Sequence, residues 1–221
     1  MTTDDTALRL KLIETCQALI PLGLTRGTAG NVSVRSGDGL LISPTGIPYD
    51  KLTPELVVHL RIDGSCDGTV LPSSEWRFHR DILVRRSELS AVVHTHSPHA
   101  TAVAVMGREI PPVHYSIAAV GGPTVRCAPY ALFGTQALSD AAVVALEGRR
   151  ACLLAHHGVI ACGRNLDRAL ALAAIVEEMA RLYVLCHAMG EPPVLTDAQI
   201  AEALAKHETY GQQIPEPRRV A

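Results

Sequence analysis

Apolar and polar residues follow two different periods along this chain. Apolar side chains that recur every three or four residues, bounded by Pro, Gly or capping residues, indicate amphipathic helices. This pattern predicts helices at residues 3–22, 73–86, 98–106, 135–146, 166–187 and 197–207. The segment 166–187 is the longest of them and carries a broad apolar face.

Short apolar runs between these helices predict strands. They lie at residues 32–35, 40–43, 57–62, 91–93, 124–128, 151–155 and 159–162. The turn at residues 36–39 joins the first two strands as a hairpin. Because several strands are linked by hairpins, we expect one mixed or antiparallel sheet flanked by helices, not a doubly wound parallel sheet.

Composition narrows the function classes. The chain has 221 residues, 48% of them hydrophobic, which is enough for a sizeable core. Its formal net charge of -2 gives no electrostatic reason to expect a nucleic-acid or membrane partner. It has no apolar run of about 20 residues and no signal-peptide pattern. Its six scattered cysteines form no CxxC pair, so we expect reduced thiols and a cytoplasmic protein.

The motif His94-Thr95-His96 follows the apolar strand at 91–93. Residues i and i+2 of a strand point to the same face, so both imidazoles can face one divalent ion. A lone buried histidine is more often structural, but two histidines at this spacing favour a metal site. A catalytic zinc ion takes three protein ligands and keeps one position open.

The pair His156-His157 offers the third ligand, after the strand at 151–155. Adjacent residues of a strand face opposite sides, so one of the two can join the site, and spacing does not say which. His79 is a rival ligand because it lies four residues after Glu75 on a predicted helix. Glu75 itself either compensates the helix dipole or lies near the metal.

Three small polar segments suggest an anion site. They are the loops 27–31 and 43–46, and Ser73-Ser74 at the start of a predicted helix. They are either turns and a helix N-cap, or backbone N–H groups and short side chains around an anion. The chain contains no phosphate loop of the Gly-Lys-Ser/Thr type and no GxGxxG motif.

Taken together, the motifs resemble those of the class II aldolases, within the superfamily that also contains sugar-phosphate 4-epimerases and the adducin head domain. The resemblance covers about residues 8–211 and is strongest to the L-fuculose-1-phosphate aldolases. It rests on five motifs in this order: Gly27-Thr28-Ala29-Gly30-Asn31-Val32-Ser33, Ser43-Pro44-Thr45-Gly46-Ile47-Pro48-Tyr49, Pro72-Ser73-Ser74-Glu75-Trp76-Arg77-Phe78-His79, His94-Thr95-His96 and His156-His157-Gly158.

The resemblance implies an α/β fold of the α+β type, with three αβα layers around a central, mostly antiparallel sheet. We expect residues 1–221 to form a single class II aldolase domain with a mobile C-terminal tail from about residue 208. The resemblance also implies a homotetramer with fourfold symmetry, whose zinc sites lie between neighbouring subunits.

The resemblance assigns residues as well. It implies Zn²⁺, or another divalent ion such as Mn²⁺ or Co²⁺, on His94, His96 and His157. Glu75 matches the catalytic acid/base, which also binds the metal while substrate is absent. The matching phosphate-binding residues are Gly30, Asn31, Thr45, Gly46, Ser73 and Ser74. Tyr115 matches a catalytic tyrosine delivered from the neighbouring subunit. Tyr210 matches a tail tyrosine that closes over the site, and with Phe133 it is a candidate for the aldehyde pocket.

The activity implied is reversible cleavage of a ketose 1-phosphate into dihydroxyacetone phosphate and an aldehyde. The candidate substrates are L-fuculose 1-phosphate, 5-deoxyribulose 1-phosphate and 5-methylthioribulose 1-phosphate. The alternatives are a sugar-phosphate 4-epimerase, a methylthioribulose-1-phosphate dehydratase, and a non-enzymatic interaction module like the adducin head. The epimerases compared carry Asp at the position of Glu75, which favours the aldolase.

Overall fold

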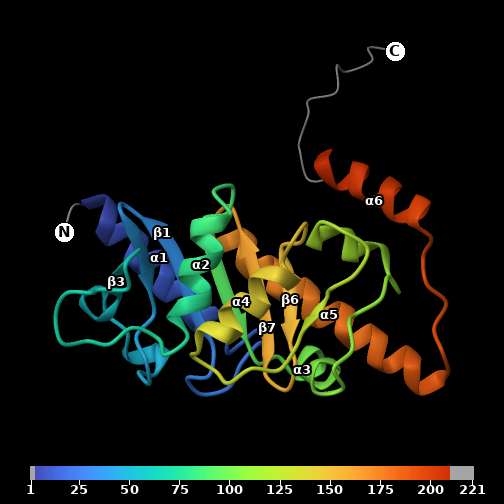
Figure 1. Ribbon diagram of the computed structural model, residues 1–221, viewed down its shortest axis with the longest axis horizontal. Coiled ribbons are helices and arrows are strands. Elements are labelled where there is room, and N and C mark those ends of the chain that lie inside the picture. The colour runs from blue at the N-terminus through green and yellow to red at the C-terminus, as the bar shows by residue number, and fades with distance from the viewer. Residues whose placement is uncertain (1–2, 210–221) are drawn as a thin grey trace, which may run out of the picture.

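The computed structural model describes residues 3–209 of the chain, and the side chains within residues 5–206. One seven-stranded sheet forms its centre, in the order β3-β2-β1-β4-β7-β6-β5 (Figure 1). Every neighbouring pair is antiparallel except β5 and β6, which run parallel. The strands are β1 Asn31–Ser36, β2 Gly39–Ile42, β3 Val58–Arg61, β4 Ala91–Thr95, β5 Cys127–Ala128, β6 Ala151–Leu154 and β7 Gly158–Gly163.

Helices cover both faces of the sheet. The α-helices are α1 Thr3–Ala18, α2 Trp76–Arg85, α3 Pro98–Val105, α4 Gln136–Ala145, α5 Leu166–Met189 and α6 Asp197–Thr209. Three short 3₁₀ helices are η1 Tyr49–Lys51, η2 Pro54–Leu56 and η3 Tyr115–Val120.

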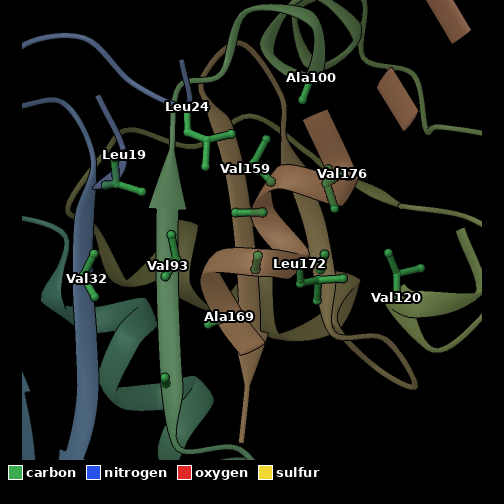
Figure 2. Packing of buried hydrophobic residues seen from close by; sticks show 14 of the residues in the cluster. Leu19, Leu24, Val32, Val93, Ala100, Val120, Val159, Ala169, Leu172 and Val176 are labelled. Atoms are coloured by element: carbon green, nitrogen blue, oxygen red, sulfur yellow. The ribbon is translucent and has the colours of Figure 1, made fainter. Parts of the chain in front are cut away.

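Side chains alternate across the strands and create two separate cores. Val93 packs with α1, α3 and α5 on one face, where Leu172 and Val176 of α5 lie over the sheet (Figure 2). Val92 points the other way and packs with residues of α2 and α4, among them Phe78 of α2 and Leu138 of α4. The expected three-layer αβα arrangement with a mostly antiparallel sheet is therefore confirmed.

The register of the central strands brings polar residues together. Asn31 of β1 pairs with His94 of β4, and His94 pairs in turn with Ile160 of β7. Since β1, β4 and β7 are neighbours in the middle of the sheet, the residues at this end of the three strands share one corner of the molecule.

Several element boundaries differ from the prediction. The first helix ends at Ala18 rather than at residue 22, because the chain turns through Gly23, whose φ of +68° is accessible to glycine. The strand predicted at 124–128 is reduced to Cys127–Ala128. The 3₁₀ helices were not predicted, because three to six residues are too few to show a helical period.

The far C-terminal part of the chain is described only in part. Helix α6 packs against η3, and the backbone N–H of Leu195 donates to the carbonyl of Pro112 at 2.9 Å just before it. Tyr210 and the rest of the expected tail, residues 210–221, lie outside the described residues. None of the helices in the described part combines the length and apolar character needed to cross a bilayer.

Candidate active site

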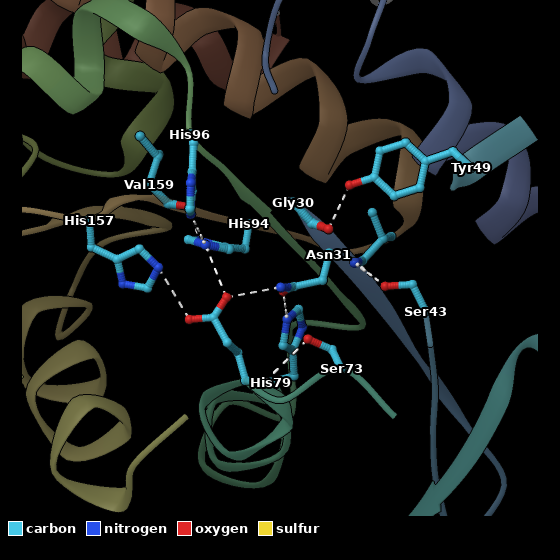
Figure 3. A network of polar contacts seen from close by, with 12 residues as sticks. Gly30, Asn31, Ser43, Tyr49, Ser73, His79, His94, His96, His157 and Val159 are labelled. Carbon is cyan, nitrogen blue, oxygen red and sulfur yellow. Dashed lines mark hydrogen bonds and ion pairs between the residues drawn. The ribbon is translucent and has the colours of Figure 1, made fainter. Parts of the chain in front are cut away.

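Three imidazoles converge at the corner where β1, β4 and β7 meet. One nitrogen from each of His94, His96 and His157 lies within 4.8 Å of the others (Figure 3). The Nε2 atoms of His94 and His96 are 2.9 Å apart, and the three rings stand at 71–80° to one another. Rings crossed in this way direct ring nitrogens at a common point instead of stacking.

The backbone sets which nitrogen of His94 is free. Its Nδ1 lies 2.8 Å from the carbonyl oxygen of Val159, which can only accept, so Nδ1 carries the proton and donates. The ring nitrogen that faces the cluster is therefore Nε2, and a carbonyl that holds Nδ1 in this way orients a metal-ligating histidine. His94 is completely buried, so water does not compete for this position.

Gly158 makes room for this arrangement. A Cβ atom at Gly158 would lie 2.4 Å from the carbonyl oxygen of Thr95 and 2.9 Å from Cδ2 of His96. It would also lie 3.3 Å from Cε1 of His94. Glycine at the start of β7 is therefore required for the close approach of the chain to both ring-bearing residues of the His94-Thr95-His96 motif.

Glu75 completes the cluster. Its Oε2 lies 3.2 Å from Nε2 of His94, and its Oε1 lies 3.2 Å from Nε2 of His157. Burial by itself raises the pKa of this carboxyl, but the imidazoles of His94 and His157 and a hydrogen bond from Asn31 outweigh burial and hold the pKa well below its usual range. The side chain is therefore a carboxylate at neutral pH.

The donor set fits a divalent metal ion. Burial lowers the pKa of His96 and of His157 to about 4, so both rings are neutral and can offer a lone pair. Oε1 of Glu75 is buried without a hydrogen-bond partner, which is costly for a carboxylate oxygen unless a cation lies nearby. Three imidazole nitrogens and one carboxylate are ligands that suit zinc and similar ions.

His79 is not placed to act as the rival ligand. Its Nδ1 lies 2.7 Å from Oγ of Ser33. Its Nε2 lies 2.5 Å from Oδ1 of Asn31, a contact that Figure 3 shows. Both ring nitrogens are thus already engaged behind the cluster. Asn31 in turn donates from Nδ2 to Oε2 of Glu75 at 3.0 Å.

The three small polar segments line one cavity of about 370 Å³ together with Glu75, His96 and His157. Backbone hydrogen bonds tie two of them together, because Thr45 N–H donates to Leu71 and Ser73 N–H donates to Ser43. The six residues expected to bind phosphate all face this cavity: Gly30, Asn31, Thr45, Gly46, Ser73 and Ser74. Among the described residues, the lining contains no lysine and no arginine.

The serines do not cap the helix as expected. Helix α2 begins at Trp76 with Glu75 in the N-cap position, and the Glu75 side chain makes no capping hydrogen bond. Oγ of Ser73 instead accepts from the backbone N–H of Glu75 at 3.3 Å. Of the two alternatives for these serines, the N-cap is not observed, because the pair lies one and two residues before the N-cap position, while both serines line the cavity.

The remaining predicted residues differ in whether they line the cavity. Phe133 lines the cavity and is 61% exposed. Tyr115 is 58% exposed at the start of η3 and is not among the described residues that line the cavity. Sequence reasoning missed Tyr130, which also lines the cavity. His156, the alternative to His157 as third ligand, lines it too and has a φ of +56° in the turn between β6 and β7.

A comparison with protein families assigns the chain to one of them. The model described as "Class II Aldolase and Adducin N-terminal domain" matches residues 10–184. The chain belongs to this family. Class II aldolases depend on a metal ion, and in this class II aldolase the three clustered imidazoles supply a place for one.

Individual relatives agree with the family and with the resemblance seen in the motifs. An L-fuculose phosphate aldolase of Escherichia coli strain K12 is 51% identical over 210 residues, which cover 95% of this chain and 98% of the relative. A 5-methylthioribulose-1-phosphate/5-deoxyribulose-1-phosphate aldolase of Rhodospirillum rubrum is 49% identical over 213 residues, 96% of each chain. A solved structure of an L-fuculose 1-phosphate aldolase superimposes with a TM-score of 0.89 at 36% identity, covering 94% of this chain and 98% of that chain.

Proposed function

We propose that this class II aldolase cleaves a ketose 1-phosphate reversibly into dihydroxyacetone phosphate and an aldehyde. One observation carries the proposal: the buried carboxylate of Glu75, the imidazoles of His96 and His157 and a lining of small polar loops share a single cavity, and His94 lies behind them in the same cluster. Such a cavity suits a substrate with sugar oxygens at one end and a phosphate at the other. The printed names of its relatives, aldolases acting on fuculose and ribulose phosphates, support the same reaction class.

We propose Zn²⁺ as the metal, with Mn²⁺ or Co²⁺ as other ions the ligands accept. His94, His96 and His157 would hold it, with Glu75 as a fourth ligand while substrate is absent. When bound, the ion supplies Lewis-acid stabilisation of the negative charge that develops as the carbon–carbon bond breaks. None of the three lysines of the chain, Lys11, Lys51 and Lys206, is among the residues that line the cavity, so a lysine Schiff base is not our proposal.

Glu75 carries the proton transfer at carbon. In the condensation direction its carboxylate takes a proton from the hydroxymethyl carbon of dihydroxyacetone phosphate, and in cleavage the resulting acid returns that proton to the same carbon. Oε1 is the oxygen for this task, because Oε2 already accepts a hydrogen bond from Asn31 while Oε1 accepts none.

The phosphate is held by neutral donors. The cavity is lined by hydroxyl groups, by the Asn31 carboxamide and by glycine backbone, close to the N-terminus of α2. Unpaired N–H groups at a helix N-terminus favour an anion without a formal positive charge.

We propose a homotetramer whose neighbouring subunit supplies Tyr115. The reaction needs a group that exchanges the proton of the hydroxyl formed from the aldehyde, and a tyrosine hydroxyl serves this role in acid–base catalysis. The exposure of Tyr115 on one chain is compatible with its insertion into a second chain. Phe133 and Tyr210 are proposed for the aldehyde pocket.

We also propose that residues 1–221 are one domain and that the enzyme acts in the cytoplasm. The continuous seven-stranded sheet supports the first proposal, and six free thiols support the second.

The decisive experiment compares three substrates. The zinc-loaded protein is assayed with L-fuculose 1-phosphate, 5-deoxyribulose 1-phosphate and 5-methylthioribulose 1-phosphate, and released dihydroxyacetone phosphate is followed with a coupled NADH-dependent reductase. We expect release from at least one of them, abolished by a chelator and restored by zinc. Conversion of substrate without dihydroxyacetone phosphate would indicate an epimerase or a dehydratase. Absence of bound metal and of any turnover would indicate an interaction module.

A further inference from the structure

His79 is the buried titratable group at this corner for which the reaction provides no role. It is completely buried in α2 and does not line the cavity, yet both of its ring nitrogens are hydrogen bonded. A polar side chain is costly to bury in a core, so a non-functional position here would favour an apolar residue.

The direction of each hydrogen bond follows from the carboxylate. Oε2 of Glu75 can only accept, so the atom of Asn31 at 3.0 Å from it is the donor Nδ2. Oδ1 of Asn31 then faces His79 and must receive a hydrogen from Nε2 at 2.5 Å. In the neutral ring Nδ1 is consequently an acceptor, and Oγ of Ser33 donates to it at 2.7 Å.

The ring is neutral because of its surroundings. Burial lowers the pKa of His79 to about 3, and the nearby His94 acts in the same direction. Hydrogen-bond donation therefore runs one way, from Ser33 through His79 and Asn31 to Glu75. Rotation of the Asn31 carboxamide by 180° would bring two hydrogen-bond acceptors face to face at the Glu75 carboxylate and two donors face to face at His79.

We propose that His79 is a positioning residue that holds the Asn31 carboxamide in the orientation in which it donates to Glu75. The inference rests on the proposed function for its link to catalysis. Asn31 also lines the cavity, so His79 fixes the orientation of a side chain that is proposed to bind phosphate. His79 itself does not line the cavity, so it would influence the substrate only through Asn31.

Two substitutions separate hydrogen bonding from bulk. In His79→Gln the amide nitrogen takes the place of Nε2 and can still donate to Asn31. In His79→Asn the shorter side chain reaches only the position of Nδ1, so Oδ1 of Asn31 loses its donor. We expect kcat/KM to fall about 10–100-fold in His79→Asn, the usual effect of removing a group that orients a metal-site residue, and to recover in His79→Gln. Equal loss in both variants would overturn the proposal.

A second comparison asks whether His79 acts through Asn31. In an Asn31→Ala background, the change His79→Asn should cause no further loss of kcat/KM, because the residue being positioned is gone. If His79→Asn lowers kcat/KM by the same factor with and without Asn31→Ala, His79 has a merely structural role and the proposal is overturned. The matched control is His59→Asn in β3, a histidine whose Nε2 lies near the Ser36 carbonyl, and its kcat/KM should equal that of the parent.

A spectroscopic test does not depend on activity. The ¹⁵N shifts of His79 in the full-length protein, with and without zinc, should report the Nε2–H tautomer. Ser33→Ala removes the donor to Nδ1 but leaves Oδ1 of Asn31 as an acceptor, so the Nε2–H tautomer should persist in this variant. An Nδ1–H tautomer in the parent protein would overturn the proposal. If the parent cleaves no ketose phosphate, the proposed function fails, while the tautomer measurement still decides the inference about His79.

Discussion

A methyl group added at Gly158 tests the construction of the metal site without replacing a ligand. The Cβ of Gly158→Ala would lie 2.4 Å from the carbonyl oxygen of Thr95, between the two histidines of the motif. An ordinary C···O contact is about 3.3 Å, so one of the two strands must move by roughly 0.9 Å. Because β4 carries His94 and leads into His96, the shift separates these rings from His157.

The size of the effect follows from this displacement. A misplacement of about 1 Å at a reacting centre costs on the order of 100-fold in rate. Overpacking a core costs about 1–3 kcal/mol. At about 2–4 °C per kcal/mol for a chain of this length, the thermal midpoint should fall by roughly 2–12 °C. We therefore expect a folded protein with a small loss of stability and a large loss of metal and activity.

Metal content by elemental analysis, kcat/KM and thermal unfolding are measured together. Gly163→Ala is the matched control: it lies at the other end of the same strand, and its Cβ would meet the backbone nitrogen of Ala169 at 2.5 Å, a similar overlap far from the histidines. The control should lose comparable stability but keep its metal. The reasoning is refuted if Gly158→Ala retains full metal and parent activity, or if both variants lose metal alike.

Three further predictions concern single groups. Glu75→Gln should keep zinc and lose turnover by on the order of 100-fold or more, the usual size of an acid–base contribution; cleavage at the parent rate would remove Glu75 from the mechanism. Tyr115→Phe should slow cleavage while light scattering still reports a tetramer, and unchanged kinetics would assign Tyr115 to packing. The metal-free protein should lose stability between pH 7 and pH 5. Burial keeps His79 neutral to about pH 3 in the fold, whereas an unfolded histidine binds its proton near pH 6.5, so the unfolded state gains about 2 kcal/mol at pH 5. A thermal midpoint that is equal or higher at pH 5 would contradict this sign.

Much of the fold was predictable from local patterns. The seven strands and six α-helices of the described residues were all expected from periodicity. Each element buries one face, and the apolar residues of that face recur at short, regular intervals in the sequence. The parallel pairing of β5 with β6 was not predictable, since a two-residue strand is defined by its partner and not by its own pattern. Glu177 shows the same limit. Helical periodicity assigns it to a polar face, yet its carboxylate accepts from the backbone N–H groups of His99 and Ala100 at the start of α3.

The candidate site was predictable to the extent that its chemistry is local in sequence. The His94-Thr95-His96 spacing indicated a shared face, whereas the choice between His156 and His157 depended on the turn between β6 and β7, where His156 has left-handed φ. The role proposed for His79 was hidden because this residue of α2 depends on Ser33 and Asn31, which come from strand β1. Long-range hydrogen bonds of this kind leave no period in the sequence.

The pairing of Asn31 with His94, and of His94 with Ile160, has a consequence for how the chain reaches its native state. A slip of one residue between these strands would turn His94 to the opposite side of the sheet. Only chains with the correct alignment would then possess a high-affinity ion site. Added zinc would therefore stabilise correctly aligned molecules over misaligned ones during assembly, and the cation would act as a selector of strand alignment before it takes any part in turnover.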